Sequence, residues 1–275
     1  MVKHIMGDSE GPKVSILMPA RNSEKTIKRS IASVQRQTFE SWELIVVDDC
    51  STDKTCELVA WLASDDPRIK LISSKKQVGP GNSRITAFRA SKGNVIAMLD
   101  SDDLWLPEKL EEAYGLIESG RYRFIHTGHR ALVGSRVSVR ISSHTVSAHA
   151  QITSRNPIVN SSAVFCRSLM KGVTKLDSDR GTDWELWRIF SAEGADLTYI
   201  SSYSCIYGVY PNSFSGNKVA MASRHLNDLR QISKHKWILA RRFFVYAVNG
   251  LRVSLLRRTP SPLSSRIRNV LGIDK

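Results

Sequence analysis

Short apolar runs alternate with amphipathic stretches over the first hundred residues of the chain. Between the runs, apolar residues recur at helical spacing, as Ile27, Ile31 and Val34 do. Runs that are apolar at nearly every position are typical of strands buried on both faces. Strands and helices in alternation predict a parallel sheet with right-handed crossovers. The four predicted strands lie at residues 14–19, 42–47, 69–72 and 94–99.

The pattern is less regular in the second half of the chain. We expect a strand at 124–126 and a hairpin within 133–141, followed by a polar loop. Residues 160–165 predict a strand that returns to the sheet, and an acidic stretch at 177–183 leads into a helix rich in aromatic side chains. The expected fold class is therefore α/β, with a Rossmann-like, mostly parallel central sheet flanked by helices.

The net charge of +14 is concentrated at the C-terminal end of the chain. Residues 216–275 hold thirteen Lys and Arg against two Asp, which is +11 and leaves +3 for all other residues. We therefore expect three parts: a polar leader at 1–12, an α/β domain at 13–215, and a basic amphipathic helical tail at 216–275.

Apolar residues of the tail share one helical face, and basic residues surround them. This is the form of an interfacial anchor on an anionic membrane surface. A helix packed on the domain with a solvated basic face is the alternative. Nucleic acid is not an expected partner, because only charge favours it and no nucleic-acid-binding motif accompanies that charge. The apolar residues are Trp237, Phe244, Val248, Leu251 and Leu255.

The four cysteines form no Cys-x-x-Cys pair, which fits a reducing compartment. The N-terminal residues have no apolar core of signal-peptide length, and no run approaches the length of a membrane span. We therefore expect a cytoplasmic protein that is peripheral on the inner face of the cytoplasmic membrane.

Carboxylates gather where two of the predicted strands end. Asp48 and Asp49 follow the second strand, and Asp100, Asp102 and Asp103 follow the fourth. Parallel strands share a carboxyl edge, and ligands bind at that edge in open α/β sheets. Like charges this close require a cation or hydrogen-bond donors, and hard oxygen ligands favour Mn²⁺ or Mg²⁺ together with substrate phosphates. We therefore expect a metal and diphosphate site, with a helix N-cap as the alternative.

The first turn from strand to helix contains no glycine. Pro19-Ala20-Arg21-Asn22 stands where a dinucleotide-binding fold has G-x-G-x-x-G, so the backbone there does not cradle a pyrophosphate. Neutralisation by a metal ion that Asp100 and Asp102 hold is more consistent with this sequence.

Four motifs, taken together and in this order, resemble those of the family 2 inverting glycosyltransferases. The resemblance covers about residues 13–215 and points to bacterial enzymes of surface-polysaccharide assembly. It implies a GT-A fold with a nucleotide-sugar-binding half at 13–106 and an acceptor half at 107–215, a UDP-sugar donor, and Mn²⁺ or Mg²⁺ as cofactor. The motifs are Pro19-Ala20-Arg21-Asn22, Val46-Val47-Asp48-Asp49-Cys50-Ser51-Thr52-Asp53, Gly79 with Arg84, and Leu99-Asp100-Ser101-Asp102-Asp103-Leu104-Trp105.

The resemblance also implies roles for individual residues. Asp102 and Asp100 would hold the metal, and Asp49 would hydrogen-bond the uracil. Asp183 matches the catalytic base of the family. The acceptor side would include Asn160, Trp184 and Glu185. The implied nucleotide-sugar-binding residues are Pro19, Ala20, Asn22, Asp48, Asp49, Arg84, Asp100, Ser101 and Asp102.

Two segments depart from the family pattern. Thr182 stands where the family has Glu. Residues 207–215 are similar to a loop that folds over the donor diphosphate, but Gly208 and Tyr210 replace a basic residue and a His. These departures are the support for an alternative function, a catalytically degenerate nucleotide-binding module of a polysaccharide-assembly complex.

The expected function is inverting transfer of a hexose or N-acetylhexosamine from a UDP-sugar to a lipid-linked glycan acceptor. The product would belong to a capsule, O-antigen or other bacterial cell-surface polysaccharide. A metal-dependent nucleotidyltransferase is disfavoured, because the chain lacks a Gly-rich basic phosphate loop near its N-terminus.

Overall fold

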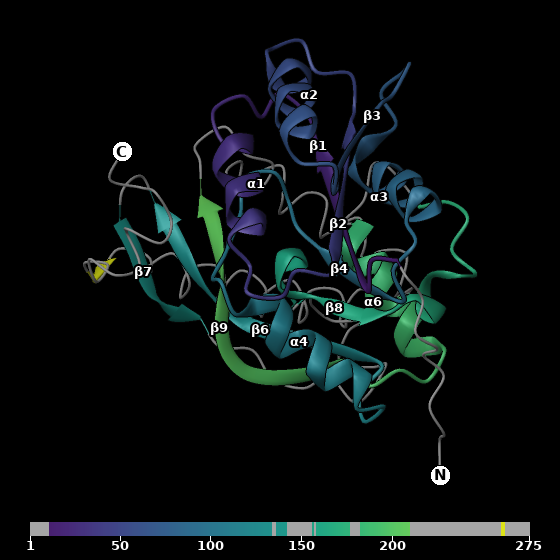
Figure 1. Ribbon diagram of the computed structural model, residues 1–275. Coiled ribbons are helices and arrows are strands. Elements are labelled where there is room, and N and C mark those ends of the chain that lie inside the picture. Colours follow the sequence, from purple (N-terminus) through teal and green to yellow (C-terminus); the bar gives the residue numbers. More distant parts are fainter. Residues whose placement is uncertain are drawn as a thin grey trace, which may run out of the picture.

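The computed structural model describes residues 11–133, 136–141, 156, 158–176, 182–209 and 260–261. Helices cover both faces of one large sheet, which confirms the α/β class (Figure 1). The helices are α1 (Ile27–Gln35), α2 (Thr55–Asp65), α3 (Gly79–Ala90), α4 (Lys109–Glu118) and α6 (Thr182–Ala192), with 3₁₀ turns η1 (Asn160–Ser162) and η2 (Arg167–Met170).

The sheet has the strand order β10-β7-β6-β8-β4-β1-β2-β3. Its parallel part is β4-β1-β2-β3, which are the four strands predicted from the apolar runs. β8 is antiparallel to β4, so the sheet becomes mixed beyond that strand. The strands are β1 (Val14–Ala20), β2 (Trp42–Asp48), β3 (Ile69–Ser73), β4 (Val95–Met98), β5 (Leu104–Trp105), β6 (Phe124–Val133), β7 (Arg136–Ile141), β8 (Val164–Cys166), β9 (Thr198–Val209) and β10 (Pro260–Ser261).

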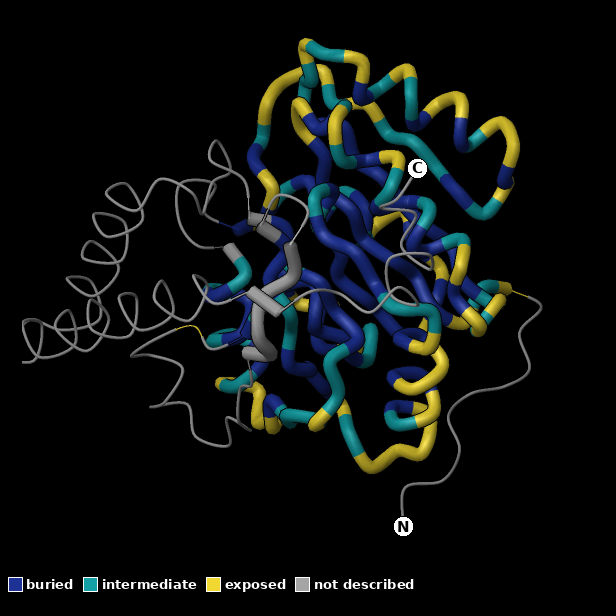
Figure 2. Tube along the Cα trace, turned by 90° about the vertical axis from the view of Figure 1, so that its left-hand side faces the viewer, coloured by how far each residue is buried: buried dark blue, intermediate teal, exposed yellow. Residues whose placement is uncertain are grey.

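Successive residues of the central strands enter two separate cores. Ile16 and Met18 of β1 pack with apolar residues of α1, α2 and α4, whereas Leu17 packs with those of α3 and α6. Figure 1 accordingly shows α1 and α3 on opposite sides of β1 and β2. Burial on both faces explains why these strands lack polar alternation, and Figure 2 shows the buried strands enclosed by exposed outer turns.

Several expected elements differ in the structure. Residues 160–165 do not form one strand, because Asn160–Ser162 make a 3₁₀ turn before β8 begins. The hairpin is formed by β6 and β7 instead of lying within 133–141, because the strand expected at 124–126 continues to Val133 and is its first strand. Residues 207–209, the start of the expected loop, belong to β9, and the rest of that loop lies outside the described residues.

The predicted tail helix, like most of the polar leader, lies outside the described residues. Of residues 216–275 only Pro260 and Ser261 are described, and they pair antiparallel with β7 (Figure 1). Within the part of the chain that the structure describes, no helix is both long enough and apolar enough to cross a membrane.

Candidate functional site

The carboxyl ends of β1, β2 and β4 meet at one edge of the sheet, as predicted. Ala20 pairs with Asp48 at the ends of β1 and β2, and β1 pairs with β4 on its other side. The loops that follow these strands are therefore neighbours. Ser23, after β1, lies beside Ser101, after β4, with 2.8 Å between their Oγ atoms. The edge is thus a continuous surface built from three loops.

Asn22 joins the first two of these loops. Its Oδ1 accepts a hydrogen bond of 2.8 Å from the Thr52 N–H, and its own N–H donates to Ser51 Oγ at 2.9 Å. Its φ of 49° lies in the left-handed region that asparagine tolerates. Pro19 and Ala20 are buried at the end of β1 beneath this loop. These three residues fix the loop, while their predicted contact with the nucleotide sugar stays a prediction.

The carboxylates of Asp48 and Asp49 are in different environments. Asp49 accepts hydrogen bonds from the N–H groups of Val78 and Gly79, at 2.7 and 2.9 Å, and so caps the start of α3. Asp48 Oδ2 accepts one from the Ser51 N–H at 3.2 Å. Asp48 Oδ1 is buried and has no hydrogen-bond partner within the described residues. A buried acceptor without a donor is costly, so Asp48 Oδ1 is suited to a donor on a ligand.

Asp100 is held by groups from two other parts of the chain. Arg84 Nη2 of α3 forms an ion pair with Asp100 Oδ1 at 2.5 Å, and Asn160 Nδ2 of η1 donates to the same oxygen at 2.9 Å. The Asp100 N–H donates to Ser161 Oγ at 2.9 Å. Arg84 is buried, and its charge compensates that of Asp100. Because both donors engage Oδ1, Oδ2 is the oxygen of Asp100 that faces a ligand most readily.

Asp103 is an internal anchor of the acidic loop. It is fully buried, and its two oxygens accept hydrogen bonds from Ser161 Oγ at 2.5 Å and from the Gly208 N–H at 2.7 Å. The loop is thereby joined to η1 and to the end of β9. Burial raises the pKa of Asp103 well above its usual range, and the charges of Asp102 and Asp100 add to this effect.

Asp102 is the second acid of the loop whose pKa is raised. Burial and then the charge of Asp100 raise its pKa to about 6 from an ordinary value of 3.8, although Arg29 of α1 acts in the opposite direction. No group of three or more His, Cys, Asp or Glu side chains converges on one point within the described residues. Two carboxylates with an excess of negative charge fit a divalent cation that also binds substrate phosphates. Asp102 and Asp100 would hold it.

Asp183 lies in the first turn of α6 and faces the same site. Its Oδ2 accepts a hydrogen bond of 2.7 Å from Asn156 Nδ2. Burial raises the pKa of Asp183, Arg84 opposes this shift, and Asp100 adds to it. Arg84 and Asp100 are thus near enough to affect the charge of Asp183, and α6 packs against α3, the helix that carries Arg84. A partly buried carboxylate at this position is chemically suited to accept a proton.

The predicted acceptor residues occupy three different environments. Asn160 contacts Asp100 directly, as described above. Trp184 is only 6% exposed and belongs to the core between the sheet and α6, so little of its ring faces an acceptor. Glu185 is partly buried on the same helix. Ser101 also supports the loop, because its carbonyl oxygen accepts a hydrogen bond from Ser30 Oγ at 2.9 Å.

A model of glycosyl transferase family 2 matches residues 15–171, which is more than half of the chain. The chain belongs to this family. The matched region contains the three loops, the acidic cluster and η1, so the family assignment rests on the residues that build the site.

Named relatives resemble the chain over most of its length. It is 29% identical over 247 residues to UDP-Glc:alpha-D-GlcNAc-diphosphoundecaprenol beta-1,3-glucosyltransferase WfgD of Escherichia coli, covering 87% of this chain and 94% of the relative. It is 26% identical over 247 residues to the putative teichuronic acid biosynthesis glycosyltransferase TuaG of Bacillus subtilis (strain 168), covering 89% and 98%.

The fold matches that of solved glycosyltransferases of the GT-A type. The mannosyltransferase PcManGT from Pyrobaculum calidifontis, solved with GDP-Man and Mn²⁺, superposes with a TM-score of 0.63. The match covers 82% of this chain and 65% of that protein, at 18% sequence identity. At this identity the likeness establishes the GT-A fold of the chain.

Several residues of the site carry no signal in the sequence. Asn156 lies in a polar stretch without periodicity, and Arg29 stands beside another basic residue, Lys28. Ser161 holds both Asp100 and Asp103, across about 60 residues of chain. Only the folded structure brings these residues to the acidic loop. The Asp-Ser-Asp-Asp pattern, by contrast, already marked Asp103 as an acid of the loop, although not as its anchor.

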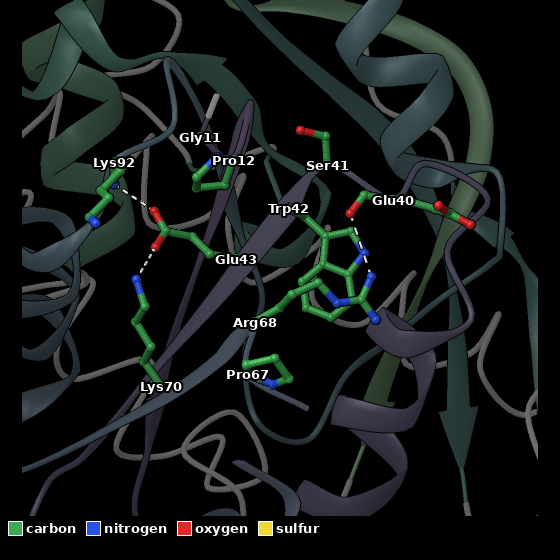
Figure 3. A pocket seen from close by; sticks show the side chains of 10 residues that line it. All are labelled: Gly11, Pro12, Glu40, Ser41, Trp42, Glu43, Pro67, Arg68, Lys70 and Lys92. Carbon is green, nitrogen blue, oxygen red and sulfur yellow. Dashed lines mark hydrogen bonds and ion pairs between the residues drawn. The ribbon is translucent and has the colours of Figure 1, made fainter. Parts of the chain in front are cut away.

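A hollow of about 380 Å³ lies at the opposite, amino edge of the strands (Figure 3). Two of the basic residues that line it form ion pairs: Lys70 pairs with Glu43 of the same lining at 2.6 Å, and Arg68 pairs with the neighbouring Asp66 at 2.9 Å. The Arg68 guanidinium also stacks on the Trp42 ring at 3.8 Å. None of the predicted site residues lines this hollow, so it is separate from the acidic site.

Proposed function

We propose that the protein is an inverting glycosyltransferase that moves a hexose or N-acetylhexosamine from a UDP-sugar to a lipid-linked glycan acceptor. The observation that carries this proposal is the convergence of Asp183 with the ion pair of Arg84 and Asp100. A candidate base therefore lies beside the acidic loop, although 83 residues of chain separate Asp100 and Asp183. Inverting transfer needs a base for the acceptor hydroxyl close to the groups that stabilise the departing diphosphate.

The donor and acceptor classes are supported by the relatives. WfgD is named for transfer from UDP-Glc to a GlcNAc-diphosphoundecaprenol, and TuaG for teichuronic acid biosynthesis. Both relatives are matched over nearly their whole length. This chain therefore has counterparts of the parts of each relative that bind donor and acceptor. We therefore assign the chain to the synthesis of a bacterial cell-surface polysaccharide.

The proposed mechanism is a single displacement at the anomeric carbon. The carboxylate of Asp183 accepts the proton of the acceptor hydroxyl, while that oxygen attacks opposite the departing diphosphate. Arg84, buried beside Asp100, supplies fixed positive charge near the reacting groups. When bound by Asp102 and Asp100, Mn²⁺ or Mg²⁺ supplies Lewis-acid stabilisation of the diphosphate. An α-linked donor then gives a β-linked product.

Localisation follows from the substrates and from the basic tail. A nucleotide-sugar donor and a lipid-linked acceptor are brought together at the inner face of the cytoplasmic membrane. The +11 charge of residues 216–275 favours attraction to anionic lipid at that face. We therefore propose a peripheral membrane enzyme of the cytoplasm.

A transfer assay tests the function. UDP-glucose, UDP-galactose, their N-acetylhexosamine counterparts and GDP-mannose are each offered with Mn²⁺ and a GlcNAc-diphospho-lipid acceptor. The proposal predicts that one UDP-sugar gives a disaccharide lipid and that Asp102→Ala abolishes the reaction. If no sugar is transferred and UDP binds without metal, the degenerate nucleotide-binding module becomes the better description, as the altered Thr182, Gly208 and Tyr210 would then indicate.

A further inference from the structure

Asn156 contacts the candidate base from an otherwise polar stretch of chain. Its Nδ2 donates a hydrogen bond of 2.7 Å to Asp183 Oδ2. Its Oδ1 accepts one of 3.1 Å from the Ile158 N–H. The second bond fixes the orientation of the amide, because only an oxygen accepts from an N–H. The amide nitrogen therefore faces Asp183 unambiguously.

The hydrogen bond from Asn156 restricts the orientation of the Asp183 carboxylate. Asp183 Oδ2 is engaged by Asn156, and the Trp184 N–H also donates to this carboxylate, so its orientation is fixed while lone pairs remain for the proton of a substrate hydroxyl. A general base must be within hydrogen-bond reach of the proton that it removes, and loss of orientation is costly even over short distances. Asn156 and Asp183 are joined by side chains only, 27 residues apart in the chain.

We propose that Asn156 is a positioning residue that orients the Asp183 carboxylate for proton abstraction, an inference that rests on the proposed function. Asn156 acts through Asp183 and touches no reacting atom. Asn160, four residues later, holds Asp100 in the same manner. The segment from Asn156 to Asn160 thus positions both the base and the acidic loop with two amide donors.

A purely local role for Asn156 makes a different prediction. In that case the amide would serve only the turn that leads to η1, through the Ile158 N–H. The variant Asn156→Asp separates the two roles, because aspartate is isosteric and still accepts from Ile158 but no longer donates to Asp183. Asn156→Ala removes both hydrogen bonds. Asn94→Ala is the matched control, since Asn94 is exposed at the opposite end of β4.

The first readout is steady-state transfer by the full-length protein. Asn156→Asp is expected to lower kcat by about 10- to 100-fold, the range for one hydrogen bond to a charged group. KM for the UDP-sugar should change by less than about 2-fold, because the contact acts on the base and not on the donor. Asn156→Ala should lose no more than Asn156→Asp, and Asn94→Ala should match the wild type.

The pH profile of kcat gives a second readout. The donated hydrogen bond favours the ionised form of Asp183, as does Arg84 of α3, whereas burial and Asp100 favour the neutral form. Both substitutions leave Arg84 and Asp100 in place. Asn156→Asp should therefore move the acid limb of the profile to higher pH, and Asn156→Ala should move it in the same direction by less.

The outcomes distinguish this inference from the proposed function. Wild-type kcat and pH profile in Asn156→Asp, beside an inactive Asp183→Asn, would overturn the positioning role and leave the base assignment standing. An active Asp183→Asn would overturn the base and the inference together. A loss in Asn156→Asp that disappears in the Asp183→Asn background supports the inference, because the two residues then act as one unit.

Discussion

Replacing Asp102 with asparagine is expected to stabilise the protein while it removes a ligand of the proposed metal site. In the folded protein, burial and the charge of Asp100 raise the pKa of Asp102 from 3.8 to about 6. A shift of about two units corresponds to at most about 3 kcal/mol. Asparagine removes this cost but also loses the attraction to Arg29, so we expect a gain of about 1 kcal/mol, or about 2–4 °C in Tm.

The pH dependence of this gain has a defined direction. A carboxyl with a raised pKa in the folded state binds protons more tightly when folded, so its cost grows as pH rises from about 4 to about 6 and is constant above. The difference in Tm between Asp102→Asn and the wild type should follow this curve. Glu57→Gln, an acid-to-amide change at an exposed position of α2, is the matched control for the loss of one carboxylate.

Calorimetry with and without Mn²⁺ and UDP measures both the stability of Asp102→Asn and its loss of metal binding. Wild-type protein should gain Tm when Mn²⁺ and UDP are added together, and Asp102→Asn should gain much less. The reasoning is refuted if Asp102→Asn is less stable than the wild type at neutral pH without metal. It is equally refuted if Mn²⁺ and UDP stabilise both proteins to the same extent.

Four other predictions concern the base, the sheet, a buried lysine and the tail. Asp183→Asn should lower kcat by about 10²- to 10⁴-fold in the transfer assay, and retention of more than about a tenth of the rate would exclude it as base. Gly93→Ala should lower the free energy of unfolding by about 1–3 kcal/mol in urea titrations, because its Cβ would lie 2.7 Å from the Ser15 backbone N; an unchanged midpoint contradicts this. Burial lowers the pKa of Lys109 from 10.5 to about 8, so the stability of the wild type relative to Lys109→Met should rise between about pH 8 and 10, and a constant difference would show that burial does not lower the pKa of Lys109. The full chain should float with anionic vesicles, and absence of binding at physiological salt would rule out the tail as an anchor.

The parallel half of the fold was predictable because its strands are buried on both faces. In a chain where strands and helices alternate, nearly continuous apolar runs such as Ile16 to Met18 are typical of strands buried on both faces. The acidic edge was predictable for a related reason, since charges directly after a buried run must lie where the strand ends. The GT-A fold and the family followed from the motifs that these strand ends carry.

The second half of the site was less predictable because its contacts are made across long stretches of chain. The pattern of residues 160–165 resembles a strand, yet Asn160 and Ser161 form a 3₁₀ turn that meets Asp100. Trp184 follows the predicted base in the motif, but its ring is buried in the core. Local patterns do not show which face of a helix's first turn meets the sheet.

The stereochemistry of transfer tests the central claim most directly. Wild-type protein is given an α-linked UDP-sugar with Mn²⁺ and the lipid-linked acceptor, and the anomeric configuration of the product is determined by NMR. One general base, Asp183, acting in a single displacement predicts a β-linked product. An α-linked product would contradict the account, because retention requires a different arrangement of groups from the one that the acidic loop, Arg84 and Asp183 form.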